Sequence, residues 1–102
     1  MFNFNNPYNN YSGNNMGENG VVVNFETLQK ARQDLIGEIQ AVMEYDVHIH
    51  STNDRIAKET WRNIKNEELT HIGELLALLN YLDSSQKQFV QRGITEFSER
   101  LK

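Results

Sequence analysis

Three residues of this chain have the types and the spacing of a metal-binding site: Glu38, Glu68 and His71. Glu68 and His71 form a Glu-x-x-His step, and three residues of α-helix turn by about 300° and rise by about 4.5 Å, so both side chains lie on one face. A carboxylate and an imidazole on one face can bind one cation together. Glu38 stands thirty positions before Glu68, so a turn midway between them would bring it to a similar height on a neighbouring helix. The spacing therefore predicts that the three side chains converge.

Two long helices must position these residues. The segment from residue 25 to residue 50 has no proline and only Gly37 as a breaker, and Asn24 can cap its start. The polar run Ser51-Thr52-Asn53-Asp54 predicts a turn followed by a capped second helix. We predict an all-α fold: an antiparallel two-helix hairpin with helices at about 25–50 and 54–82, plus a short C-terminal helix at about 85–101.

Each predicted helix has one apolar side. On the two long helices, steps of three and four residues mark a narrow inward-facing seam, which one carboxylate interrupts on the first helix and a carboxylate and an imidazole interrupt on the second. An unpaired buried carboxylate typically costs several kcal/mol, so we expect a cation to compensate for these groups. The seams and the apolar side of the third helix are Leu28, Ala31, Leu35, Glu38, Val42, Tyr45 and Ile49; Ala57, Trp61, Ile64, Glu68, His71, Leu75, Leu78 and Leu82; and Phe89, Val90, Ile94, Phe97 and Leu101.

One chain supplies only half of the ligands of a di-iron carboxylate bundle. Such bundles take one glutamate from each of two helices and a Glu-x-x-His step from each of the other two, and this sequence contains no second Glu-x-x-His. A second copy related by a two-fold axis would complete the set, and two divalent cations would then balance four glutamates. We therefore expect a homodimer that completes a four-helix bundle.

The composition narrows the class of protein. A chain of 102 residues with 38% hydrophobic content suits one small domain. The formal net charge of -4 argues against a nucleic-acid partner. The absence of cysteine excludes disulfides and thiolate metal sites, and the longest apolar run, Leu75 to Leu79, is too short for a membrane span. We expect a cytoplasmic protein without a membrane partner.

Residues 1–22 differ in composition from the rest of the chain. They are rich in Asn, Gly and Tyr and poor in aliphatic side chains, which predicts a flexible arm. A docking peptide is the alternative, because the segment carries four aromatic residues that could act as anchors: Phe2, Phe4, Tyr8 and Tyr11.

From about Leu28 to Phe97 the chain resembles the encapsulated ferritins, half-ferritins of the ferritin-like superfamily that are cargo of encapsulin nanocompartments. The resemblance runs through residues 37–46 and through the sequence Asn66-Glu67-Glu68-Leu69-Thr70-His71. It implies that residues 23–102 form a ferritin-like helical domain. It also implies that Glu38, Glu68 and His71 are iron ligands and that Tyr45, which matches a family tyrosine, belongs to the catalytic centre.

The resemblance implies a function as well as a fold. The expected activity is that of a ferroxidase, which oxidises Fe(II) with dioxygen at a di-iron site between subunits and passes the product on for storage. Manganese or zinc are possible substitutes for iron at such ligands. The expected partners are further copies of the chain in rings of dimers and an encapsulin shell protein, with a location inside the encapsulin nanocompartment.

The sequence departs from the family around the site. Gly37 and Gln40 replace acidic residues that attract iron in the family, and Glu44 replaces a tryptophan. Other acidic residues, Asp34, Glu44, Glu67 and Glu74, could form a substitute path, although solvated helix faces commonly carry such charges.

Several alternatives stay open at this point. Glu38 and His71 could form a buried ion pair in an ordinary helical dimer. A rubrerythrin-like peroxide reductase shares the bundle chemistry but usually adds a Cys-ligated iron centre, and a non-catalytic structural protein could bind zinc or no metal. His48 and His50 suit the C-terminal end of a helix, where they complement the helix dipole, while Glu44 with His48 would be a weak second metal site. Trp61, Leu75 and Leu78 are assigned to packing.

Overall fold

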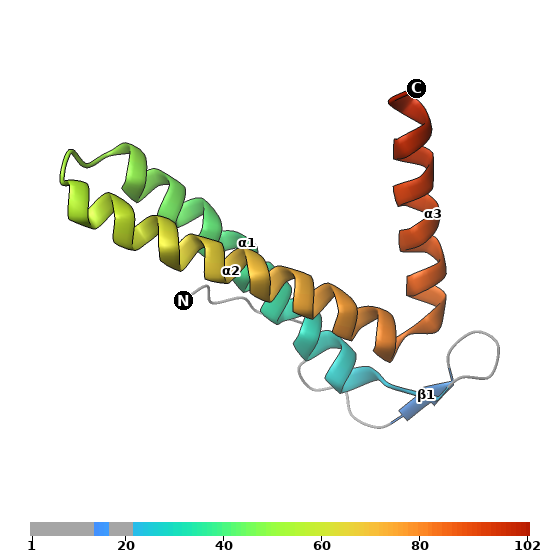
Figure 1. Ribbon diagram of the computed structural model, residues 1–102. Coiled ribbons are helices and arrows are strands. Elements are labelled where there is room, and N and C mark those ends of the chain that lie inside the picture. Colours follow the sequence, from blue (N-terminus) through green and yellow to red (C-terminus); the bar gives the residue numbers. More distant parts are fainter. Residues whose placement is uncertain (1–13, 17–21) are drawn as a thin grey trace.

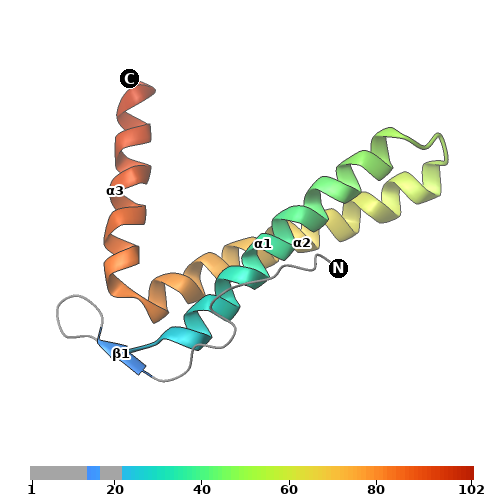
Figure 2. The ribbon, with the colours of Figure 1, turned by 180° about the vertical axis from the view of Figure 1, so that it is seen from behind.

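The chain is a helical hairpin with a third helix projecting from one end. The computed structural model describes residues 14–16 and 22–102, and the all-α prediction is confirmed by three helices, α1 (Phe25–His50), α2 (Arg55–Leu82) and α3 (Ser84–Arg100). Figure 1 shows α1 and α2 side by side, with α3 leaving the end of α2 at a steep angle, and the opposite view in Figure 2 gives the same arrangement. None of the described helices is long and apolar enough to cross a membrane.

A short strand pair that the sequence did not predict precedes α1. Strand β1 (Asn14–Met16) pairs antiparallel with β2 (Val22–Asn24), with Asn15 opposite Val23. The predicted flexible arm over residues 1–22 falls mostly outside the described residues, and its described part contributes β1 and the first residue of β2.

Side-chain caps set the starts of the three helices. The Asn24 side chain accepts a hydrogen bond of 2.8 Å from the Thr27 N–H, and Asp54 accepts one of the same length from Ala57. Asp83 accepts hydrogen bonds from the backbone of Ser85 and Gln86 at the start of α3. These caps occupy amide groups that no carbonyl of the helix can reach. They explain why the helices begin within one residue of the predicted positions.

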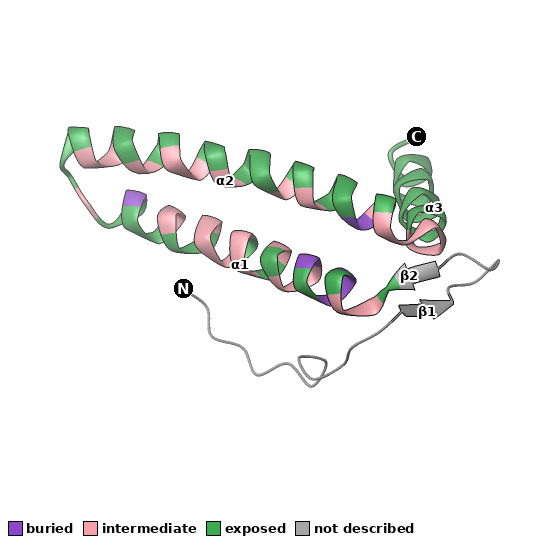
Figure 3. Cartoon of the chain, turned by 90° about the horizontal axis from the view of Figure 1, so that it is seen from below, coloured by how far each residue is buried: buried purple, intermediate pink, exposed green. Residues whose placement is uncertain are grey.

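The hydrophobic core lies at the base of the hairpin, the end at which α1 begins and α2 ends. Leu28, Ala31 and Leu79 are 3–4% exposed there, and Leu35 and Leu82 pack against them. Figure 3 shows the few buried positions as purple segments near the ends of the two helices.

Leu78, which we predicted in the core, is 39% exposed, so that prediction is wrong and Leu79 takes its place. A seam drawn in strict steps of three and four repeats every 3.5 residues. A straight helix repeats every 3.6 residues and drifts by about 20° per heptad. After three turns from Glu68, the position that faces α1 has therefore moved one residue along the chain.

Polar contacts between helices hold the two ends of the hairpin. Near the turn, Lys65 Nζ lies 2.8 Å from Asp46 Oδ1. At the base, Arg32 of α1 donates a hydrogen bond of 2.7 Å to the Gln86 side chain and lies 3.9 Å from the Asp83 carboxylate. The second set of contacts ties the beginning of α3 to α1, which fixes where α3 leaves the hairpin.

Beyond this corner α3 is not covered by the other described helices. Every residue from Lys87 to Lys102 is exposed, as the green colour of α3 in Figure 3 shows. The apolar side predicted for this helix therefore exists but is uncovered in a single chain; its members are Phe89, Val90, Ile94, Phe97 and Leu101.

Candidate metal centre

The hairpin brings the three predicted ligands together near its middle. Glu38 comes from α1, and Glu68 and His71 come from successive turns of α2. The His71 Nδ1 atom lies 3.5 Å from Oε1 of Glu38 and 3.5 Å from Oε1 of Glu68. One ligand atom from each residue falls within 4.8 Å of the others, which is compatible with a single ion between them. Among the described residues, no other group of three or more His, Cys, Asp or Glu side chains meets this condition.

The centre lies at the boundary between the seam and the solvent. The side chains of Glu38 and Glu68 are 24% and 20% exposed, whereas His71 is 47% exposed. The sequence predicted that all three would face inward, and this is correct for the two carboxylates only. His71 lies at the rim because α1 covers just one side of α2, so a single chain leaves the other side of the imidazole uncovered.

The site holds more hydrogen-bond acceptors than donors. Oε2 of Glu38 is buried and has no hydrogen-bond partner among the described atoms. No Lys or Arg of the described residues forms an ion pair with the carboxylate of Glu38 or Glu68. Those that form ion pairs do so with other acidic side chains. A buried acceptor without a donor costs roughly 1–3 kcal/mol, and more when it is charged. The arrangement therefore lacks positive charge.

The pKa of Glu68 is affected by the same excess of acceptors and negative charge. It is raised above the ordinary value first by a hydrogen bond with the Glu38 side chain, then by burial and by the negative charge of Glu38, while His71 opposes the rise. Two carboxyl groups that share a site cannot both ionise freely, so one holds its proton more tightly. A divalent cation would remove the cause of the shift by replacing that proton.

The donor set suits hard or borderline divalent metals. Carboxylate oxygens with one imidazole nitrogen are typical ligands of Fe(II), Mn(II) and Zn(II), whereas soft thiolate donors are absent from the sequence. The unpaired Glu38 oxygen shows that the residues present fit a cation. Three protein ligands fill fewer positions than these metals require, which are four for zinc and about six for manganese or iron.

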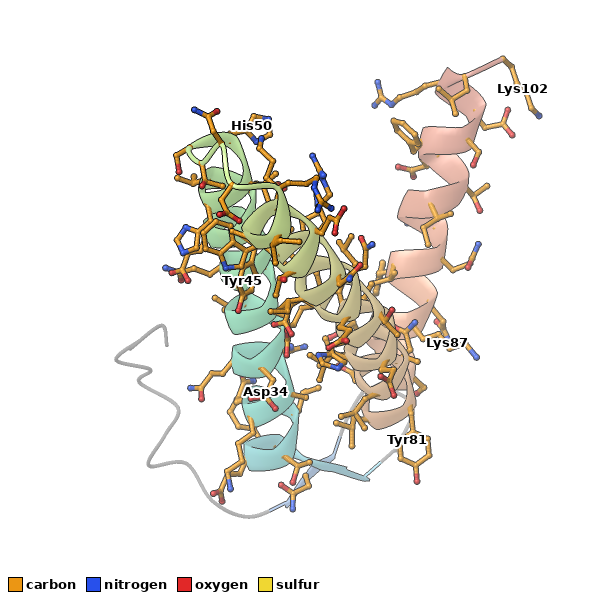
Figure 4. All side chains as sticks on the ribbon, turned by 60° about the vertical axis from the view of Figure 1, so that its left-hand side comes forward. Asp34, Tyr45, His50, Tyr81, Lys87 and Lys102 are labelled. Atoms are coloured by element: carbon orange, nitrogen blue, oxygen red, sulfur yellow. The ribbon has the colours of Figure 1, made fainter. Side chains whose placement is uncertain are left out.

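Tyr45 lies away from the three ligands, in a ring cluster nearer the turn. It follows Glu38 by one heptad, or about two helical turns, which is a rise of about 10 Å along α1. Its ring centroid lies 6.1 Å from that of His48, and His48 in turn lies 5.0 Å from Trp61, both in edge-on geometry. Figure 4 labels Tyr45 on the α1 side of the hairpin. The sequence assigned Trp61 to packing and did not predict that it would meet His48.

The remaining candidate residues do not form a second centre. Glu44 and His48 are only two potential ligands, and no third one joins them among the described residues. His50 Nδ1 lies 2.9 Å from the Asp46 carbonyl oxygen in the last turn of α1, where a histidine complements the helix dipole.

Comparisons with known proteins do not add to this description. A scan against protein-family models, a search of curated proteins and a search of solved structures found no match to this chain. The resemblance to encapsulated ferritins therefore stays a prediction from the sequence motifs around the three ligands.

Proposed function

We propose that the protein binds Fe(II) at Glu38, Glu68 and His71 and oxidises it with dioxygen, as a ferroxidase that acts as a dimer. One observation carries the proposal. Two carboxylates and an imidazole lie close enough to share one ion, and one carboxylate oxygen is buried without a hydrogen-bond donor. In the part of the chain that the structure describes, no Lys or Arg forms an ion pair with either carboxylate. Iron is the substrate in this reaction, held long enough to lose an electron and then passed on.

Each ligand has a part in this proposal. Glu68 and His71 hold the ion from α2, and Glu38 adds a carboxylate from α1. Hard anionic oxygens bind Fe(III) more strongly than Fe(II), so a carboxylate-rich site favours loss of an electron from the metal. Because each chain offers only three ligands, coordination positions stay open to dioxygen and to groups of a second chain.

A second copy of the chain is part of the proposal because the site is half-open. The uncovered side of His71 is the side on which a partner could add its own ligands. Four glutamates and two neutral imidazoles from two chains would balance two divalent ions. Metal should then promote dimerisation, and size-exclusion chromatography with Fe(II), and with a chelator, should show a larger species only in the first case. An assembly state indifferent to both would contradict the shared site.

Metal titration followed by exposure to dioxygen tests the activity. Anaerobic Fe(II) should bind at one ion per chain, and admitting dioxygen should produce Fe(III) faster than in buffer alone. Faster turnover with peroxide than with dioxygen would favour a rubrerythrin-like reductase instead. Retention of Zn(II) without any iron oxidation would favour a structural protein. Failure to bind Fe(II), Mn(II) or Zn(II) would contradict the proposal.

Storage inside an encapsulin shell is a separate part of the proposal and rests on the resemblance alone. Co-expression with an encapsulin shell protein, followed by isolation of assembled shells, should recover this chain as cargo. Shells that contain none of it would remove the encapsulin part without affecting the metal chemistry.

A further inference from the structure

Two oxidisable rings lie on the turn side of the candidate metal centre, outside its set of ligands. Tyr45 follows Glu38 by seven residues on α1, and Trp61 precedes Glu68 by seven residues on α2. Because the two helices of the hairpin are antiparallel, both steps lead toward the turn, and each corresponds to a rise of about 10 Å. One phenol and one indole therefore lie at about the same height beyond the same end of the centre.

His48 lies between these two rings. Its ring centroid is 6.1 Å from that of Tyr45 and 5.0 Å from that of Trp61, with interplanar angles of 81° and 63°. Edge-on pairs at such centroid distances are direct ring contacts. Tyr45 and Trp61 are half-buried, whereas His48 is exposed. The phenol and the indole are therefore connected through an imidazole at the interface of the two helices that carry the ligands.

The proposed reaction at the metal centre is short of electrons. Reduction of dioxygen to water takes four electrons, and two Fe(II) ions at a centre shared by two chains supply two. With no other donor, two Fe(II), one dioxygen and two protons give two Fe(III) and one hydrogen peroxide. Cysteine, which is easily oxidised, is absent from the chain. Phenol and indole rings are then the side chains that most readily give up a single electron.

We propose that the ring cluster of Tyr45, His48 and Trp61 donates one electron from each chain, so that dioxygen is reduced to water. The inference rests on the proposed function and adds the fate of its dioxygen. Trp61 lies on the helix that carries two of the three ligands and is oxidised first. Tyr45 then reduces the indole through the contact with His48, because a neutral tyrosyl radical is the more stable of the two radicals near neutral pH.

The electrons and protons of this reaction balance. Two Fe(II) ions and two phenols of Tyr45 each lose one electron to dioxygen. The two phenol protons and two protons from solvent join the oxygen atoms, which gives two waters, two Fe(III) and two tyrosyl radicals. Two further Fe(II) ions and two protons from solvent then restore the phenols. The cluster therefore lets a centre that holds two iron ions avoid the release of hydrogen peroxide.

Transfer between the rings can be measured in the metal-free protein, because Trp61 is the single tryptophan of the chain. Azide radicals made by pulse radiolysis oxidise indole selectively. The indolyl absorption should decay while the tyrosyl absorption grows, at a rate independent of protein concentration. Tyr45→Phe should lose this growth. The control is Tyr81→Phe, which should keep it, since Tyr81 is 84% exposed at the base end of α2, away from Tyr45 (Figure 4).

The product of dioxygen provides the second measurement. Protein loaded anaerobically with one Fe(II) per chain is mixed with dioxygen, and hydrogen peroxide and the electron paramagnetic resonance spectrum are recorded. The wild type and Tyr81→Phe should release little peroxide and show a tyrosyl radical. Trp61→Phe and Tyr45→Phe should lose the radical and release up to one peroxide for every two Fe(II). Phenylalanine keeps a ring at each position, and binding of Mn(II) would show that the variants remain folded.

Each outcome has a definite meaning. Ring-to-ring transfer that is absent from the wild type, or that survives Tyr45→Phe, would overturn the inference. Equal peroxide yields from the wild type and both ring variants would indicate a cluster that only packs, and would leave the ferroxidase proposal in place. A wild type that does not oxidise Fe(II) would remove the proposed function and the donation of electrons with it.

Discussion

The base of the hairpin and its middle are built from the same two helices and the same seam, yet they are closed in different ways. At the base, Leu28, Ala31 and Leu79 pack together within a single chain and are only 3–4% exposed. In the middle, Glu38 and Glu68 face each other at the edge of the seam with a half-exposed imidazole. The chain therefore stabilises itself at the base and keeps two carboxylates crowded in the middle, as expected of a binding site that is maintained at a cost in stability.

Removal of a proposed metal ligand has the largest expected effect. Glu38→Ala should lower the affinity for Fe(II) by more than about a hundredfold, beyond the loss caused by outer-shell changes, and should abolish iron oxidation. Its matched control is Asp34→Ala, one helical turn away, which should keep both. Isothermal titration and the rate of Fe(III) formation measure the two properties. Retention of full affinity by the Glu38 variant would show that the centre is not built as described.

The hydrophobic core at the base of the hairpin can be destabilised independently of the candidate metal site. Leu79→Ala should lower the free energy of unfolding of the metal-free protein by about 3 kcal/mol, because it opens a cavity among Leu28 and Ala31. The exposed Leu76 offers a control, since Leu76→Ala should cost about 1 kcal/mol or less. Urea denaturation followed by circular dichroism measures both. Similar losses for the two leucines would mean that the base is not the main core of the chain.

A smaller effect is expected at the corner between α2 and α3. Asp83 caps α3 and lies beside Arg32, so Asp83→Ala should destabilise the start of α3 by about 1 kcal/mol. Hydrogen exchange of the amides of Ser85 and Gln86 should become faster, while exchange in the middle of α1 stays unchanged. Unchanged exchange at both amides would argue that the cap does not hold the corner.

The smallest expected effect concerns the proton of Glu68 in the metal-free protein. Because the folded protein raises the pKa of Glu68, the metal-free fold binds this proton more tightly than the unfolded chain does. Its contribution to stability is complete below the ordinary glutamate pKa and is lost as the pH rises through the raised value. Glu68→Gln should therefore raise the thermal midpoint of the metal-free protein near neutral pH, by at most about 4 °C after solvent screening.

The Glu68→Gln variant should also show a weaker pH dependence of the thermal midpoint than the wild type does. In the metal-free wild type, the thermal midpoint should fall as the pH increases from the ordinary glutamate pKa through the raised pKa of Glu68. In Glu68→Gln, the midpoint should change less with pH. A wild-type midpoint that rises over the same range would show that the carboxylates are not crowded in the absence of metal. His48→Gln, outside the site, serves as the control.

Much of the fold follows from local patterns. Asn24 and Asp54 mark the helix starts because their side chains can accept hydrogen bonds from the first turn, and the structure has those bonds. The convergence of Glu38 with Glu68 and His71 was also predictable, since helical rise and the position of one turn determine their heights. The contact of Trp61 with His48 was not, because it depends on how two helices lean against each other and not on spacing within either one.

The three helices and their caps therefore follow from neighbours a few residues apart, and the heights of the chemical groups follow from helical rise and the position of one turn. Only the tertiary structure decided that Leu79 and not Leu78 enters the core, that α3 projects without cover and that His71 lies at an open rim. These features depend on the angle and phase at which two helices meet. A drift of about 20° per heptad accumulates along the chain and appears only once both helices are in place.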